Sequence, residues 1–331
     1  MKTALILPYF GKFDKLFPVW LESCRHNPEI DWLIFTDDYT NYNYPANVKV
    51  YYREFEALKQ EIQQHYDFSI SLETPYRLCN FKPAYGELFA DYLEGYDAWG
   101  FCDNDMIYGR LYCFLPSTLP SKTKFGKYGH LTILPNTQEG REIYRYANVY
   151  KIAFSTPQPL FFDEDSFTKI LIKNGYTEYP LHIADFMPRL KHFKVLNEDG
   201  MEWKNEAHCF VWKNGVLNRY YVNPHNGEIQ KEEYAYIHFL KRPMEVAERL
   251  DCGKPIVIVP NMIINMPEEE ITKDFLRCVS RPGVFVAYWK NSFKPHNLME
   301  RAKNRLYQNR LNRVLIEKMN KMIWEYETRV Y

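Results

Sequence analysis

The chain has 331 residues, 46% of them hydrophobic, which is enough to bury one large core or two smaller ones. Its 42 basic and 42 acidic residues give a formal net charge of zero, so overall charge does not indicate a nucleic-acid partner, and none is expected. The seven cysteines are odd in number and form no CxxC pair, which argues against a disulfide-stabilised secreted protein.

Strand and helix patterns alternate along the first hundred residues. A continuous apolar run at 3–7 and the segment at 31–36 are typical of buried strands, 48–52 is typical of a third short strand, and helical spacing of apolar residues lies at 17–24 and 54–65. This alternation predicts an α/β fold with a mainly parallel sheet flanked by helices. Such sheets bind ligands at the carboxyl ends of their strands. Two loops follow strands in this way: Pro8, Tyr9, Phe10 and Gly11 after the first, and Asp37 and Asp38 after the second.

Arg77 and Lys82 lie in a segment that leads into a helical pattern at 87–93. Two cations beside the free N–H groups of a helix start can hold an anion such as a phosphate. The alternative is that both side chains are ordinary solvated charges.

A further apolar run, at 98–102, ends at two aspartates, Asp103 and Asp105, which are separated by Asn104. Mg²⁺ and Mn²⁺ prefer carboxylate oxygens, so two carboxylates at a strand end are a candidate metal site. The alternative is a surface turn, in which Asp and Asn are common. Placement at the same sheet edge as the two earlier loops favours the metal site.

Three consecutive acids, Asp163, Glu164 and Asp165, precede a helical pattern at 167–173. Acids at a helix N-terminus are favourable capping and dipole partners. The alternative is that one of them acts as a general base and accepts a proton from a substrate hydroxyl.

A late apolar strand contains His238 and is followed by Lys241 and Arg242. His238 is a candidate third metal ligand, and Lys241 or Arg242 is a candidate phosphate partner. The alternative is that His238 is a core histidine with a satisfied hydrogen bond.

Residues 299–326 combine helical spacing with many basic side chains. Such a helix either contacts an anionic membrane or packs its apolar face on the rest of the protein. We expect a catalytic domain at 1–260, with a nucleotide-binding half at 1–110 and an acceptor half at 111–260, and a helical extension at 261–331. No stretch reaches about 18 apolar residues, and the first apolar run is too short for a signal peptide. A cytoplasmic protein is therefore expected, at most peripheral at the inner face of the membrane.

The absence of a G-x-x-x-x-G-K-[ST] loop disfavours a P-loop NTPase, and the absence of G-x-G-x-x-G after the first strand disfavours a dinucleotide oxidoreductase. A metal held by carboxylates, with cations nearby, suits a departing diphosphate. These patterns favour glycosyl transfer from a nucleotide sugar. A sugar nucleotidyltransferase and a non-catalytic carbohydrate-binding domain are the alternatives.

Several segments in order resemble bacterial glycosyltransferases of the GT-A type: LPYFG, FTDD, PYRLCNFKPAYG, GYDAWGFCDNDMIYG and IHFLKRP. More narrowly, they are similar to an uncharacterised glycosyltransferase-like family of capsule and surface-polysaccharide gene clusters. The resemblance implies a GT-A-like fold, Mn²⁺ or Mg²⁺, a nucleotide-sugar donor, and a saccharide or lipid-linked saccharide acceptor. The product would be a capsular or O-antigen-type polysaccharide.

The resemblance also implies roles for single residues. Asp103 and Asp105 would form the D-x-D motif, with Asp105 as the direct metal ligand and His238 completing the site. Asp37 or Asp38 would contact the nucleoside, Pro8–Gly11 would line the base and ribose pocket, and Arg77, Lys82 and Lys241 would lie near the diphosphate or donor sugar. The glycine usual between that histidine and lysine is absent here. Asp165 is the first candidate for a catalytic base and Glu164 the second, and inversion or retention stays open.

Overall fold

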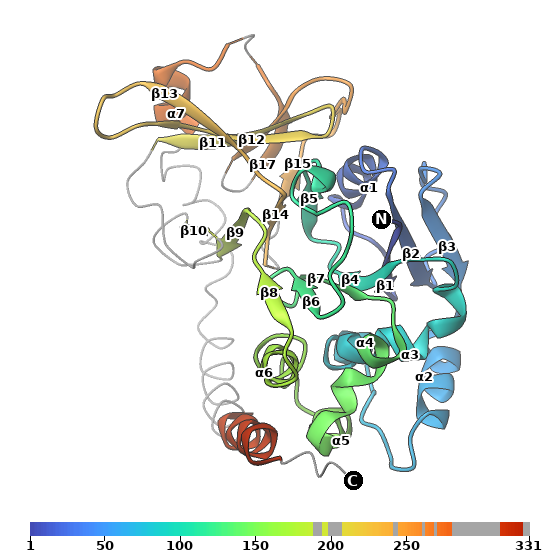
Figure 1. Ribbon diagram of the computed structural model, residues 1–331. Helices are drawn as coiled ribbons and strands as arrows, with labels where there is room; N and C mark the ends of the chain where they lie inside the picture. The colour runs from blue at the N-terminus through green and yellow to red at the C-terminus, as the bar shows by residue number, and fades with distance from the viewer. Residues whose placement is uncertain are drawn as a thin grey trace, which may run out of the picture.

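The structure is a computed structural model that describes residues 1–187, 194–197, 207–240, 244–259, 262–267, 270–279 and 312–326. A seven-stranded mixed sheet occupies its middle (Figure 1). In spatial order its strands are β3 (Val48–Tyr52), β2 (Ile30–Thr36), β1 (Thr3–Pro8), β4 (Ala98–Cys102), β7 (Leu131–Pro135), β6 (Thr123–Phe125) and β8 (Thr177–Tyr179). The first four are parallel, whereas β7 runs antiparallel to both β4 and β6. The α/β prediction is confirmed, but the sheet is mainly parallel only in its N-terminal half.

The change of direction has a local cause. A parallel return needs a long crossover, usually a helix. The segment between β4 and β7 contains no α-helix, only the strands β5 (Met106–Tyr108) and β6 and a short 3₁₀ turn at Leu111–Cys113. β7 therefore returns antiparallel to β4.

Alternate residues of β1 fill two separate cores, as expected for a strand covered on both faces. Ala4 and Ile6 pack into one core and Leu5 and Leu7 into the other. Four helices pack into the first core: α2 (Phe55–Gln64), α3 (Tyr85–Leu88), α5 (Val149–Ser155) and α6 (Asp165–Lys173). The short helix α4 (Gln138–Glu142) lies beside α3. The second core is covered by α1 (Phe17–Arg25). Instead of one helix at 87–93, a 3₁₀ run at Pro75–Ala84 leads into α3 and a further turn at Ala90–Tyr92.

Two further sheets stand beside the central one (Figure 1). The four-stranded sheet has the order β10 (Lys194–Leu196), β9 (Ile183–Met187), β14 (Tyr236–His238) and β5. The six-stranded sheet has the order β13 (Ile229–Glu233), β12 (Val216–Val222), β11 (His208–Lys213), β16 (Ile256–Val259), β17 (Met262–Asn265) and β15 (Glu245–Val246), and α7 (Lys273–Val279) packs on it. β16 and β17 pair across residue 260, where the sequence suggested a domain boundary.

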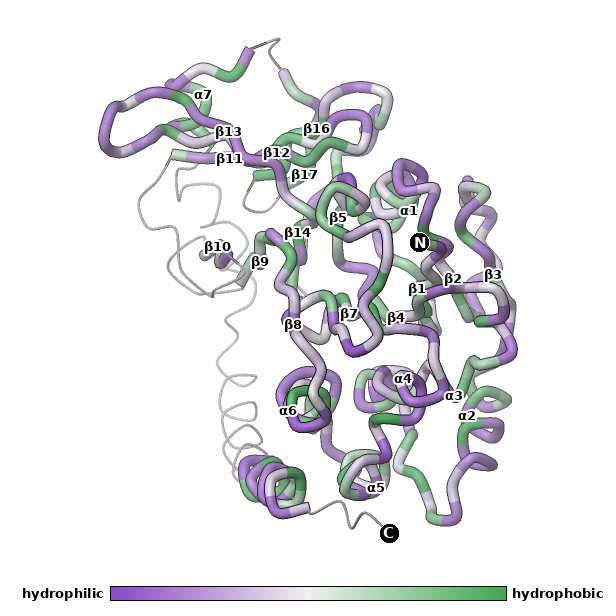
Figure 2. Tube along the Cα trace, in the orientation of Figure 1, coloured by the Kyte–Doolittle hydropathy of each residue, from purple (hydrophilic) through white to green (hydrophobic). Residues whose placement is uncertain are grey.

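The described part of the basic C-terminal segment is a helix over 312–325 that lies beside α5 and α6 (Figure 1). Its residues alternate between hydrophobic and hydrophilic around the helix (Figure 2). Met319 and Ile323 are fully buried in the core that contains α5 and α6, so this stretch packs on the domain. Residues 299–311 lie outside the described residues. Among the described helices, none is long and apolar enough to cross a membrane.

Met319→Ala is expected to lower the free energy of unfolding by about 2–5 kcal/mol, because it opens a cavity under the C-terminal helix. Val314→Ala on the same helix is the control, since Val314 is 56% exposed and its truncation should cost less than about 0.5 kcal/mol. Urea unfolding followed by tryptophan fluorescence measures both variants. Equal losses would contradict the packing of this helix on the domain.

Candidate functional site

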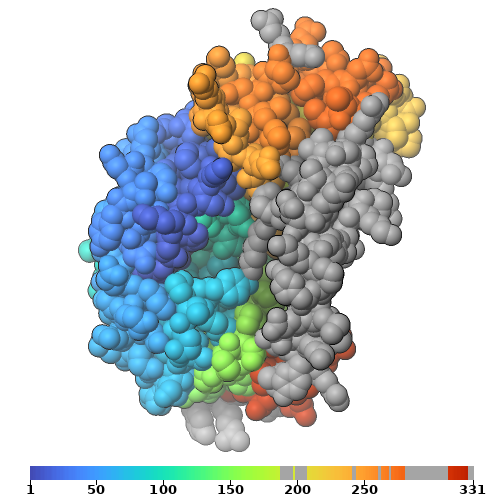
Figure 3. All heavy atoms as spheres, turned by 180° about the vertical axis from the view of Figure 1, so that it is seen from behind, coloured from blue at the N-terminus to red at the C-terminus, as the bar shows by residue number. Residues whose placement is uncertain are grey.

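A pocket of about 830 Å³ opens at the carboxyl ends of β1 and β4. Figure 3 shows the surface hollowed between the blue N-terminal part of the chain and the orange part, with teal residues at the floor. Most of the predicted site residues line this pocket: Pro8, Tyr9, Phe10, Lys82, Asp103, Asp105, Asp163, Glu164 and His238. The loops after β1 and β4, which the strand-end rule predicted to lie at one edge of the sheet, therefore both line this pocket.

Lys82 is a buried cation that joins two of the predicted acids. Its Nζ lies 2.8 Å from Asp103 Oδ1 and 3.1 Å from Asp163 Oδ2, and it donates a 2.9 Å hydrogen bond to the Gly129 carbonyl. Burial alone would lower the pKa of Lys82, but the charges of Asp103 and Asp163 outweigh it and raise the pKa well above its ordinary value. Lys82 therefore holds Asp103 in place, with all three of its donors occupied by protein groups.

Replacing Lys82 by methionine is expected to lower the free energy of unfolding by about 3–5 kcal/mol, because it leaves the buried carboxylate of Asp163 and the partly exposed one of Asp103 without their cation. The loss should shrink between pH 7 and pH 5, since burial raises the pKa of Asp163 and protonation removes its charge. Urea unfolding at both pH values measures the effect. Lys49→Met is the control, because the Lys49–Asp31 pair is 43% exposed on the lysine side and is worth at most about 1 kcal/mol. A loss at Lys82 no larger than at Lys49 would contradict this account.

His238 lies between two carboxylates because of strand register. β14 pairs with β9 so that His238 is opposite Asp185, and the N–H of Phe239 donates to the Asp105 carbonyl at 2.9 Å. His238 Nδ1 is 3.0 Å from Asp185 Oδ1, and its Nε2 is 3.5 Å from Asp105 Oδ1. Burial alone would lower the pKa of His238, but Asp105 and Asp185 overcome it and raise the pKa to about 10.

Asp103, Asp105 and His238 each offer one donor atom, and these atoms lie within 4.8 Å of one another. Two carboxylates and one imidazole suit a divalent cation such as Mn²⁺. Such a cation would replace the proton on His238 Nε2, since both compete for the same lone pair. Asp185 would then hold the Nδ1–H, the arrangement by which an outer carboxylate orients a ligating histidine. The residues present therefore fit the cation that the D-x-D pattern implied.

Glu164 and Asp165 are adjacent in sequence but differ in environment. Glu164 lines the pocket, and burial, followed by the charge of Asp163, raises its pKa to about 7. Asp165 begins α6, is 58% exposed, and pairs with Lys169 one turn later at 2.6 Å. Asp165, the first candidate for a base, therefore lies outside the pocket, because the start of the helix turns its side chain away.

Several other predicted residues also lie away from the pocket lining. Asp37 accepts a 2.6 Å hydrogen bond from the N–H of Gly11, and the buried Asp38 accepts one of 3.0 Å from Phe13. These two acids fix the loop after β1, so they support the pocket wall without lining it. Arg77 is buried and donates to the Thr156 carbonyl, away from the lining residues. Lys241 lies outside the described residues.

Sequence reasoning missed two pocket residues that touch His238. Asp185 lies in the middle of an otherwise apolar strand, and His130 immediately precedes β7 and stacks on His238 with ring centroids 4.1 Å apart. A charged residue inside an apolar strand run was the available signal for Asp185. Nothing local marked His130.

Two of the five described non-glycine residues with positive φ lie at the pocket. Phe161 and Leu240 are bulky residues with φ of 50° and 43°, a left-handed conformation that costs about 1–2 kcal/mol outside glycine. Both line the pocket. Phe161 lies shortly before Asp163 and Glu164, and Leu240 follows His238 by two positions. Strain of this kind is typical of functional sites.

A family model with the description "Family of unknown function (DUF6625)" matches residues 5–267, a span that contains all the pocket residues named above. No curated protein matches the chain. Because the match covers well over half of the sequence, the chain belongs to the DUF6625 family, whose function is not known.

Proposed function

We propose that this protein is a metal-dependent glycosyltransferase that transfers a sugar from a nucleotide-sugar donor to a cell-surface polysaccharide or its lipid-linked precursor. The observation that carries the proposal is the convergence of Asp103, Asp105 and His238, with donor atoms within 4.8 Å, in a pocket of about 830 Å³ at the strand ends. A pocket of this volume is large enough for a small organic ligand.

When bound by these three residues, Mn²⁺ or Mg²⁺ would supply positive charge to the departing diphosphate. Lys82 acts as a positioning residue, because it fixes the Asp103 carboxylate and has no donor left for the substrate. Pro8, Tyr9 and Phe10 form the wall that would contact the base and ribose.

Glu164 is the candidate base for an inverting reaction. It lines the same pocket, and its pKa of about 7 leaves a substantial deprotonated fraction near neutral pH. A base with a pKa near the working pH is most effective in accepting the proton of an acceptor hydroxyl. Asp163 is tied to Lys82 and would tune Glu164 through its charge.

The acceptor, on this proposal, is a saccharide or lipid-linked saccharide reached at the cytoplasmic face of the membrane. The described helix at 312–325 buries Met319 and Ile323 in the domain, so its apolar face is not free for a membrane. Any contact with anionic lipid would therefore use the basic side chains of the 299–326 segment.

A thermal-shift panel of nucleotide sugars, with and without Mn²⁺, tests the function. We expect one donor to raise the melting temperature only when Mn²⁺ is present, since a ligand at 100 times its Kd adds about 2.7 kcal/mol to stability. A shift with nucleoside triphosphate and sugar phosphate would indicate a nucleotidyltransferase instead. A shift with free oligosaccharide alone, without metal, would indicate a carbohydrate-binding domain.

A further inference from the structure

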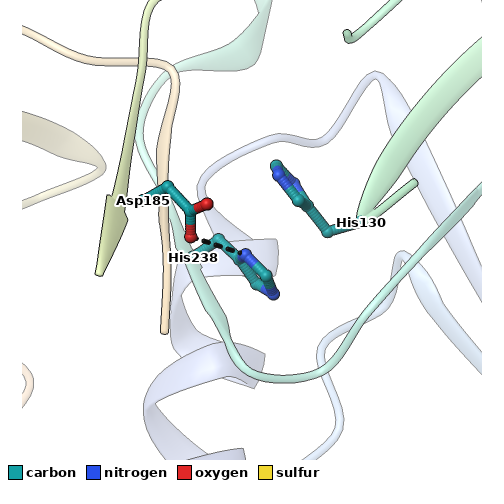
Figure 4. Close-up of side chains that lie close together, drawn as sticks. All are labelled: His130, Asp185 and His238. Atoms are coloured by element: carbon teal, nitrogen blue, oxygen red, sulfur yellow. Dashed lines mark hydrogen bonds and ion pairs between the residues drawn. The ribbon is translucent and has the colours of Figure 1, made fainter. Parts of the chain in front are cut away.

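Three pocket residues form a second group of potential metal ligands. His130 immediately precedes β7, Asp185 lies in β9 and His238 ends β14, and one donor atom from each lies within 4.8 Å of the others. Figure 4 shows the Asp185 carboxylate and the His130 ring on either side of His238. This group shares only His238 with the D-x-D set.

The polar ring nitrogens of His130 are not used by the described structure. His130 is 6% exposed, and within the described part of the chain neither ring nitrogen has a hydrogen-bond partner. A buried polar group without a partner costs about 1–3 kcal/mol. Both ring nitrogens are therefore open to a partner that the structure does not hold, and an imidazole nitrogen with a free lone pair is a good ligand for a transition metal.

We propose that His130, Asp185 and His238 form a second cation site, selective for Zn²⁺ and similar transition metals, that competes with the D-x-D site for His238. Two imidazoles and one carboxylate favour Zn²⁺ over the hard cations Mg²⁺ and Mn²⁺, which prefer oxygen-rich sets. Zn–N bonds of about 2.0 Å in a tetrahedral site place ligand atoms about 3.3 Å apart. The donor atoms lie within 4.8 Å of one another, so binding requires the stacked rings of His130 and His238 to rotate toward a shared ion.

The two sites exclude each other because of the chemistry of one ring. A neutral imidazole has a single lone pair, so His238 ligates one cation at a time. Its Nε2 faces Asp105 and its Nδ1 faces Asp185, so the nitrogen that gives up its proton to a cation selects the site. Zn²⁺ bound at His130 and Asp185 therefore removes His238 from the D-x-D set. Zn²⁺ should therefore inhibit Mn²⁺-dependent sugar transfer. This inhibition rests on the proposed function, whereas the binding of Zn²⁺ does not depend on it.

Calorimetric titration of the full, metal-stripped chain with Zn²⁺ alone tests the site. We expect one Zn²⁺ to bind, and His130→Phe and Asp185→Asn each to weaken binding at least about 10-fold, since even outer partners of metal ligands matter by about 10–100-fold. Asp103→Asn should leave Zn²⁺ affinity within about 3-fold. His225→Gln, which changes an exposed histidine, is the control for surface binding and should have no effect.

His130→Phe should keep the melting temperature at or above that of the wild type, because it removes an unpartnered buried polar ring and retains an aromatic one. Loss of Zn²⁺ binding in a folded His130→Phe variant supports the proposal. The proposal would be overturned if the wild type bound no Zn²⁺ or if His130→Phe bound Zn²⁺ as tightly as the wild type. It would also be overturned if Asp103→Asn lost as much Zn²⁺ affinity as His130→Phe. Failure of the nucleotide-sugar panel with Zn²⁺ binding intact would remove the proposed function and leave this site standing.

Discussion

Asp105→Asn is expected to abolish Mn²⁺-dependent binding of a nucleoside diphosphate, with a loss of more than about 100-fold, while the protein stays folded. The substitution removes one of two carboxylates from the donor set and keeps the size of the side chain. Loss of an outer partner of a metal ligand already costs about 10–100-fold, so loss of a direct ligand should exceed that. Calorimetry with a nucleoside diphosphate, with and without Mn²⁺, gives the measurement.

A second readout follows from His238. Asp105 is the strongest of the influences that raise the pKa of His238 to about 10, so the variant should bring this pKa down. His238 is protonated at neutral pH in the folded state but largely neutral in the unfolded state, so the stability it contributes is present below about pH 6.5 and is lost as pH rises toward 10. In Asp105→Asn this pH-dependent loss should become smaller. Histidine NMR titration measures the pKa directly.

Asp14→Asn provides the matched control for charge. Asp14 lines the same pocket but belongs to neither donor group, and its carboxylate accepts a hydrogen bond from the N–H of Leu16. Both variants remove one negative charge from the pocket. A difference in nucleotide binding between them therefore reports metal coordination and not the overall charge of the pocket. An equal loss of binding in the two variants would contradict the assignment of Asp105 as a ligand.

The strands that carry the site could be predicted because they are buried on both faces. The apolar segments at 3–7, 31–36 and 98–102 coincide with the buried strands β1, β2 and β4 to within one residue, and the strand pattern at 48–52 coincides with the more exposed β3. Where such strands run parallel, their carboxyl ends meet at one edge. That rule alone brought Tyr9 and Asp103 to the same pocket.

The contacts made by His238 could not be predicted, because they depend on pairing between distant strands. His238 and Asp185 are 53 residues apart and meet only because β14 and β9 are paired in one particular register. A shift of one residue would turn Asp185 to the opposite face of the sheet. No local pattern fixes such a register, so the partner of His238 was found only in the structure.

The misplacement of Arg77 and Asp165 has a different cause. Both were assigned to the pocket from their neighbours in sequence, but side-chain direction changes with each residue. Arg77 lies between the pocket residues Tyr76 and Leu78 and yet points to the Thr156 carbonyl. Spacing along the chain locates a segment, whereas the local turn decides which of its side chains reaches the ligand.

Glu164→Gln is expected to slow sugar transfer by about 10²–10⁴-fold, the usual contribution of a general base. Donor binding should change little, because Glu164 belongs to neither metal donor group. Asp165→Asn is the control: its carboxylate lies outside the pocket and pairs with Lys169, so transfer should stay within about 2-fold of the wild type.

The pH dependence of the wild type gives an independent check on the same residue. Burial and then the charge of Asp163 raise the pKa of Glu164 to about 7. Only the deprotonated carboxylate accepts a proton, so kcat/KM should rise with pH, and the midpoint of this rise should lie near pH 7. The midpoint of kcat/KM reports the pKa of the group in the free enzyme. Asp163→Asn removes a neighbouring negative charge and should move that midpoint to lower pH. A midpoint that stays in place in Asp163→Asn, or that persists in Glu164→Gln, would assign the titration to another group and remove Glu164 as the base.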